Sequence, residues 1–220
     1  ELFSVGAGVS YNETVYKQKA FRNSESFDIP VDLYYHVTEK YALSAGYSFR
    51  DTHVSNDNDR QTHFFNVGVR GEILPKLNGQ VRVGYNYVEY QKHSNRDGLG
   101  VRGSLSYAWT PKFSLTTSLN KDFRTAANGN VTEVTGGSLT ASYDINPLWN
   151  ASASIGYREE DYKDSNGRKD KITSGGLGIS YVPVEYLRLS GHYSLQSNSS
   201  SISSLGYTNN VFSLTASLRY

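Results

Sequence analysis

The chain between residues 149 and 158 reads Trp149-Asn150-Ala151-Ser152-Ala153-Ser154-Ile155-Gly156-Tyr157-Arg158, and this stretch decides the fold. Apolar and polar side chains alternate along it with the two-residue period of a β-strand. The same alternation runs through residues 113–120 and 139–144. Tyr, Thr, Val and Phe suit a pleated surface, whereas frequent Gly weakens helices. These stretches predict an all-β protein.

Prolines recur with a period of 36 residues, at Pro75, Pro111, Pro147 and Pro183. Each lies in a short turn, and counting back one further period reaches Glu39 in another turn-like segment. A fixed period indicates that one structural unit is repeated. We interpret the unit as two long strands, joined by a polar loop and followed by a tight turn.

On this basis twelve strands are expected, at roughly 2–15, 25–37, 40–53, 62–74, 77–91, 98–110, 112–125, 133–145, 148–162, 172–183, 185–196 and 208–220. Short turns follow the even-numbered strands. Longer segments rich in Asn, Asp, Ser, Gly and Lys follow the odd-numbered ones. Such alternation is typical of a membrane barrel with one plain end and one end that faces outward.

Composition leaves few other classes open. The 220 residues carry a net charge of +1 and no cysteine, so neither nucleic-acid binding nor disulfide bonding is indicated. Mean hydropathy is −0.53, and no apolar run approaches the ~20 residues of a membrane helix. No linker divides the chain, and we therefore expect residues 1–220 to form a single transmembrane β-barrel domain.

Each expected strand has an apolar face and a polar face. The apolar face collects Phe27, Ile29, Val31, Leu33, Tyr35, Leu43, Ala45, Tyr47, Phe49, Val81, Val83, Tyr85, Tyr87, Phe212, Leu214, Ala216, Leu218 and Tyr220. The polar face collects Ser, Gly, Thr, Asn and charged residues. In a soluble sandwich the apolar face would form the core, whereas in a membrane barrel it would contact lipid.

Three features favour the membrane barrel over the soluble sandwich. Aromatic residues gather near both ends of the strands, as at the two membrane–water interfaces. Ser and Gly dominate the polar face, which suits side chains converging inside a closed barrel. The strand number is even, and each strand can supply the ~9–11 residues needed to cross a membrane. The expected fold is a closed antiparallel barrel with hairpin topology and both termini at the short-turn end.

Fourteen charged residues on the polar face are the candidate pore-lining residues: Arg50, Arg70, Arg82, Arg102, Arg124, Arg158, Arg188, Arg219, Asp28, Asp32, Glu72, Asp122, Asp144 and Glu160. Guanidinium groups bind carboxylates and phosphates through a rigid fork and donate to sugar hydroxyls. They can therefore form a selectivity track for anionic or sugar-like solutes. The alternative is cross-strand ion pairing that holds the barrel wall together.

Catalysis and metal binding are not expected. Of five histidines (His36, His53, His63, His93 and His192), only His36 and His192 fall on the polar face. Ser190 and Ser194 flank His192, but the third group and oxyanion site of a catalytic triad are not indicated. The acidic segment 56–59 lacks the pattern of a calcium loop, and we expect no cofactor.

The last residues, Phe212-Ser213-Leu214-Thr215-Ala216-Ser217-Leu218-Arg219-Tyr220, resemble the C-terminal assembly signal of Gram-negative outer-membrane proteins. The whole chain is similar to β-barrel porins of the exopolysaccharide-associated type. This resemblance implies a place in the bacterial outer membrane, among lipid and lipopolysaccharide, and the barrel assembly machinery as a partner.

The leading functional hypothesis is a channel for passive diffusion of small hydrophilic solutes, either saccharides or anions. The alternative is a non-conducting structural or interaction barrel, for example a component of a polysaccharide export assembly. An enzyme is the third and least favoured hypothesis.

Overall fold

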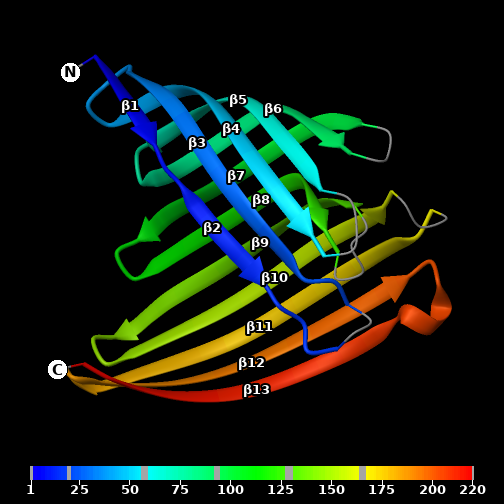
Figure 1. Cartoon of the computed structure of the whole chain (residues 1–220). Coiled ribbons are helices and arrows are strands. Elements are labelled where there is room, and N and C mark those ends of the chain that lie inside the picture. Colours follow the sequence, from blue (N-terminus) through cyan, green and yellow to red (C-terminus); the bar gives the residue numbers. More distant parts are fainter. Residues whose placement is uncertain are drawn as a thin grey trace.

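The computed structural model describes residues 2–18, 21–55, 59–91, 95–126, 131–163 and 167–219. Within them lies one curved antiparallel sheet in which each long strand pairs with the next along the chain (Figure 1). Its strands are β1 (Phe3–Ala7), β2 (Ser10–Thr14), β3 (Ser24–His36), β4 (Tyr41–Val54), β5 (Arg60–Leu74), β6 (Leu77–Tyr90), β7 (Arg96–Thr110), β8 (Phe113–Thr125), β9 (Val131–Asn146), β10 (Trp149–Tyr162), β11 (Lys169–Val184), β12 (Leu187–Ser200) and β13 (Tyr207–Leu218). A 3₁₀ turn, η1 (Ser203–Leu205), precedes β13.

The predicted up-and-down topology is confirmed, but the predicted count of twelve strands is wrong by one. The first expected strand is interrupted, because β1 and β2 both pair with β3 and are separated at Gly8 and Val9. The cause lies opposite the gap. Gly8 donates its N–H to the carbonyl of Pro30, but Pro30 has no N–H to return, so the ladder loses a bond at this point.

Three of the short turns share one local structure. The side-chain oxygens of Thr38, Thr110 and Asn146 each accept hydrogen bonds from the backbone N–H groups two and three residues later. These three residues occupy equivalent positions of the repeat. A side-chain acceptor at the start and proline at the next position both favour a tight turn. The prediction that Pro183 lies in a short turn is wrong, because Pro183 lies within β11 and the turn follows at residues 185–186.

Burial is inverted relative to a soluble protein. Large apolar side chains such as Val5, Leu214 and Leu218 are more than 70% exposed, whereas Asp32, Asn86, Asp122 and Asp170 are buried. The predicted apolar face is thus the convex outer side of the sheet, and the predicted polar face is its concave inner side. This distribution excludes the sandwich, whose apolar face would be buried.

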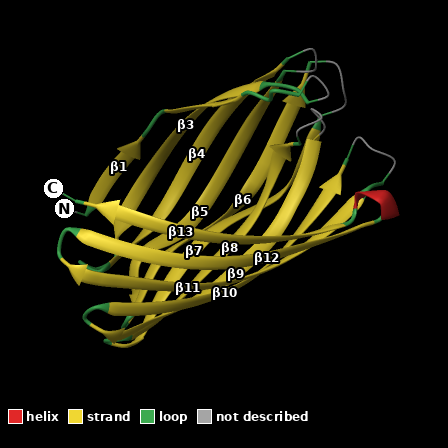
Figure 2. Ribbon diagram, turned by 90° about the horizontal axis from the view of Figure 1, so that it is seen from below, coloured by secondary structure: helices red, strands yellow, loops and turns green. Residues whose placement is uncertain are grey.

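The sheet is open within the described residues, since β13 pairs with β12 and β1 pairs with β3, and neither pairs with the other. Both chain ends lie beside the short turns, as predicted, and the strand ends that the longer connections join lie at the opposite end (Figure 2). None of the described residues form a helix that is long and apolar enough to cross a membrane. Tyr220, His93 and most of the acidic segment (56–58) lie outside the described residues.

Candidate functional site

The concave polar face brings together charged residues from strands that are not neighbours. Arg50 on β4 lies 3.8 Å from Asp122 on β8, and Arg82 on β6 lies 3.0 Å from Asp32 on β3. Such contacts can form only across the hollow of the curved sheet. They place these four predicted pore-lining residues inside the molecule.

The first charged group is centred on Asp122. The Arg102 guanidinium donates to its carboxylate at 2.8 Å, while the Arg50 guanidinium approaches the same oxygen from the other side. Arg50 also donates to Asp28 at 2.8 Å, and the Ser48 hydroxyl donates to the second oxygen of Asp28 at 3.0 Å. Two arginines and two carboxylates therefore link β3, β4, β7 and β8.

The second charged group is organised by Tyr34, whose role the sequence did not indicate. Its hydroxyl accepts from Arg82 at 3.1 Å and donates to Asp32 at 3.2 Å. The Arg70 guanidinium lies over the Tyr34 ring, 3.8 Å from its centre. A cation above an aromatic face is stabilised by the ring quadrupole. Among the described residues, no carboxylate pairs with Arg70.

Glycines create the space for these side chains. A Cβ atom at Gly100 would lie 2.5 Å from the Phe64 ring, and one at Gly68 would lie 2.9 Å from Cγ of Arg82. Phe64 is itself almost fully buried and carries the Arg102 guanidinium 4.5 Å from its ring centre. A larger residue at either glycine would displace the buried groups.

The other predicted lining residues are dispersed rather than gathered into these two groups. Glu72 pairs with Lys40 at 3.2 Å, and Asp144 accepts from the amide of Asn150 at 2.8 Å. Arg158 Nε lies 2.8 Å from the Glu160 carboxylate, in a charge contact that lacks hydrogen-bond geometry. In the described part of the chain, no ion pair involves the following predicted lining residues: Arg124, Arg188 and Arg219.

The interior is most tightly packed near the longer connections. Val88, Phe123 and Val131 form a buried apolar cluster there, with Tyr90 packed against it. We call these four residues the loop-end cluster. Toward the short turns, by contrast, the polar-face residues Ala108, Asp144 and Asn146 are exposed. The hollow is therefore narrow at the loop end and wide at the turn end.

The polar face of β9 to β12 is smooth compared with that of β3 to β8, because most of its side chains are small. Serine, glycine and threonine line most of it, and neighbouring hydroxyls bond to each other, as between Ser180 and Ser190 at 3.1 Å. A similar Ser118–Ser138 contact of 2.7 Å joins β8 to β9. This part of the polar face therefore carries few bulky side chains.

The convex face has the dimensions of a membrane band. On β10 its apolar stretch runs from Trp149, stacked on Tyr181 at 4.4 Å, to Tyr157. Eight strand steps of ~3.3 Å span about 26 Å along the strand, or ~20 Å at a tilt of ~40°. This is close to the ~25 Å apolar band of outer-membrane barrels.

Charged side chains begin where the apolar band ends. Lys121 and Lys163 both contact Glu133, at 2.9 and 2.7 Å, and Lys163 also contacts Asp161 at 2.7 Å. Lys163 follows the end of β10. Partial burial lowers the pKa of its ammonium group, but the hydrogen bonds to Asp161 and Glu133 outweigh this effect and raise the pKa overall. This group of ion pairs marks the level at which the strands leave the hydrocarbon.

Comparison with known families decides the class of protein. Residues 61–220 match the family model described as "Putative beta-barrel porin 2". The chain belongs to this family. Its porin membership places the chain in the bacterial outer membrane, as predicted.

Solved structures support the fold of this porin-family chain. The outer membrane channel DcaP of Acinetobacter baumannii is similar with a TM-score of 0.58 and 10% identity, over 97% of both chains. The FrpB iron transporter from Neisseria meningitidis gives a TM-score of 0.65 and 9% identity, over 90% of this chain and 41% of the transporter. Among curated proteins, no sequence matches. The fold is therefore that of outer-membrane channels.

Proposed function

We propose that this chain is an outer-membrane channel through which small hydrophilic solutes diffuse passively along the polar face. The observation that carries the proposal is the smooth, accessible wall of Ser, Gly and Thr on β9 to β12, inside a sheet whose apolar residues face outward. A wall of this kind offers hydrogen bonds to hydrated solutes and presents few bulky obstacles.

The proposal includes closure of the sheet through β13 and the interrupted β1–β2 strand. β13 runs toward the short turns and β1 runs away from them, as their registers with β12 and β3 show. The two edges are thus suitably oriented for antiparallel pairing. Closure would satisfy the unpaired N–H and C=O groups of both edges, which are costly in hydrocarbon.

A hydrated interior is supported by buried polar atoms. Both side-chain polar atoms of Asn86 and one of Asn66 are buried and have no protein partner. Such groups are normally satisfied by ordered water. The amides lie in the same part of the molecule as the two charged groups, since Asn86 is in register with Phe64.

Arginine favours anionic or sugar-like solutes as cargo. The Arg70 guanidinium stacks on the Tyr34 ring, and no described carboxylate pairs with it. Arg188 lines a cavity of about 310 Å³ near the short turns, together with Asn150 and Ser180. Guanidinium forks bind carboxylates and sugar hydroxyls. We therefore expect faster passage for small saccharides and sugar acids than for cations of similar size.

A non-conducting barrel is the second candidate, and a specific observation favours it. The Arg50–Asp122 and Arg82–Asp32 pairs cross the hollow, and the loop-end cluster packs its narrow end. A lumen sealed in this way would suit a structural or interaction role, such as a part of a polysaccharide export assembly. The absence of catalytic activity stays a prediction.

Solute uptake into proteoliposomes distinguishes the two candidates. We expect swelling with neutral and acidic monosaccharides, and slower uptake of the acidic sugar with Arg188→Ala. Lys171→Ala is the matched control, because Lys171 is an exposed cation on the convex face. Equal, background-level uptake by folded wild-type protein and empty liposomes would favour the sealed barrel.

A further inference from the structure

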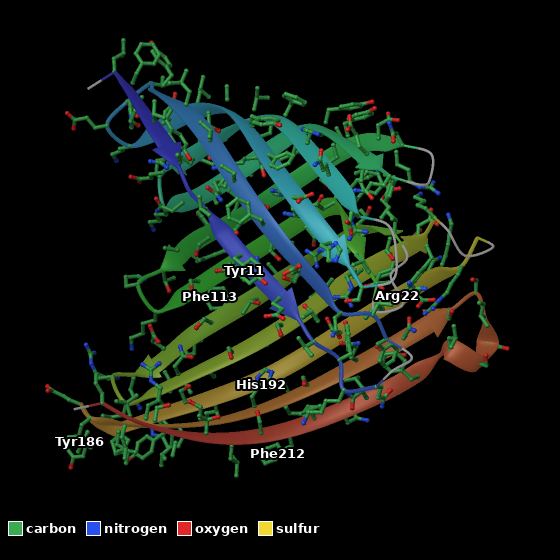
Figure 3. All side chains as sticks on the ribbon, in the orientation of Figure 1. Tyr11, Arg22, Phe113, Tyr186, His192 and Phe212 are labelled. Carbon is green, nitrogen blue, oxygen red and sulfur yellow. The ribbon has the colours of Figure 1, made fainter. Side chains whose placement is uncertain are left out.

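His192 stands apart on the smooth part of the polar face. It is the sole histidine between residues 149 and 218. It lies in register with Gly178 on β11 and Ser213 on β13, six residues into a strand of fourteen. The residue is exposed, and Figure 3 shows it well inside the span of the sheet rather than in a connection.

Two glycines on the neighbouring strand seat the imidazole ring. A Cβ atom at Gly176 would lie 3.2 Å from His192 Cε1, and one at Gly178 would lie 3.3 Å from Nδ1. The same two positions are 2.7 and 2.6 Å from the hydroxyl oxygens of Ser154 and Ser152. The ring thus lies against the glycine backbone of β11 in a polar setting, on the side that faces the hollow.

Among the residues that the structure describes, no neutralising partner faces this ring. The nearest charged residue on the polar face of β12 is Arg188, four positions away, and that of β11 is Asp170, eight positions from Gly178. β13 carries no acidic or basic residue, and on β10 Arg158 and Glu160 contact each other. In the described part of the chain, no carboxylate pairs with His192. A charge on its ring would therefore act on passing solutes.

We propose that His192 is a pH-dependent selectivity residue, whose protonation makes the path more selective for anions. Imidazole is the side chain whose charge ordinarily changes between pH 5 and 8. The arginines of the other wall are already charged and largely paired with carboxylates. This inference rests on the proposed channel function and adds a regulated step to it.

The expected effect is modest and measurable. One unit charge at ~5 Å from a passing ion in water, screened by ~0.1 M salt, changes the ion's local concentration roughly two- to fourfold. The anion-to-cation permeability ratio of the wild-type protein should rise by at least this factor between pH 8 and pH 5, because the same charge enriches anions and depletes cations.

The test is the zero-current potential in planar bilayers under a potassium chloride gradient, at pH 8 and pH 5. His192→Asn should lose the shift, and His192→Lys should show at pH 8 the anion preference of the wild type at pH 5. Two controls should keep the shift. His36→Asn alters the other polar-face histidine, which bonds to Ser4, and His63→Asn alters one that stacks among aromatic rings on the apolar face.

Each failure has a distinct meaning. A conducting channel whose selectivity is the same at both pH values, or whose shift survives in His192→Asn, would overturn the role of His192 and leave the channel function intact. Silence at both pH values from folded, inserted protein would overturn the channel function, and this inference with it.

Discussion

Asp122 contacts two arginines, Arg102 from the neighbouring strand β7 and Arg50 from β4 across the hollow. Its side chain is only 8% exposed, while those of Arg50 and Arg102 are 27% and 34% exposed. Removing the shared carboxylate charge would leave two partly buried cations facing each other. Breaking a buried pair is costly for this reason, although the partial exposure of both arginines reduces the penalty.

We predict that Asp122→Asn lowers the free energy of unfolding by about 1–3 kcal/mol. Urea unfolding in lipid vesicles measures the change. Glu185→Gln is the control, because Glu185 is exposed and has no ion pair within the described residues. Equal unfolding midpoints for the two variants would show that the Asp122 contacts contribute nothing to stability.

At the scale of the element, the turns are specified by single residues. The Asn146 side-chain oxygen accepts from the N–H groups of Leu148 and Trp149, at 2.9 and 3.0 Å. Trp149 is the first residue of β10 and Leu148 immediately precedes it, so the turn and the register of the hairpin depend on the same two bonds. An exposed turn of this kind is stabilised by such local acceptors.

We expect Asn146→Ala to destabilise the protein by about 1 kcal/mol and to speed hydrogen exchange at the Leu148 and Trp149 amides. Exchange measured by mass spectrometry with peptide resolution reports this locally. Asn209→Ala, near the start of an exposed strand, is the comparison. Unchanged exchange at the start of β10 would mean that proline alone sets the turn.

Most elements were predictable because alternation and turn chemistry are local properties. Eleven of the twelve expected strands correspond one-to-one to β3 through β13, with ends that differ by a few residues. The break between β1 and β2 was missed, because the alternation of the first strand shows no fault. Its cause is Pro30 on the neighbouring strand, and its effect depends on register.

At the scale of the whole molecule, the sheet has two unlike parts. Strands β3 to β8 curl tightly enough for side chains to meet across the hollow, whereas β9 to β12 present a smooth wall. For Asp32, Arg50, Arg82 and Asp122, the side of the sheet on which the residue lies was predictable from alternation. The partners of Asp32 and Asp122 were not, because pairs between distant strands depend on curvature. Tyr34 was missed for the same reason.

These two parts bear differently on function. In the channel proposal, the smooth wall supplies a path for solutes, while the ion pairs and the loop-end cluster narrow this path without sealing it. Under the channel proposal, a chain with this interior should conduct ions through a small opening. The channel proposal claims that the open wall leaves a conducting path although the loop end is packed.

Single-channel recording of the refolded wild-type protein in a planar bilayer tests that claim most directly. We expect stable, uniform conductance steps, small for an outer-membrane channel because the loop end is packed. An absence of steps from protein shown to be folded and inserted, by its resistance to protease and its β-sheet circular dichroism, would contradict it.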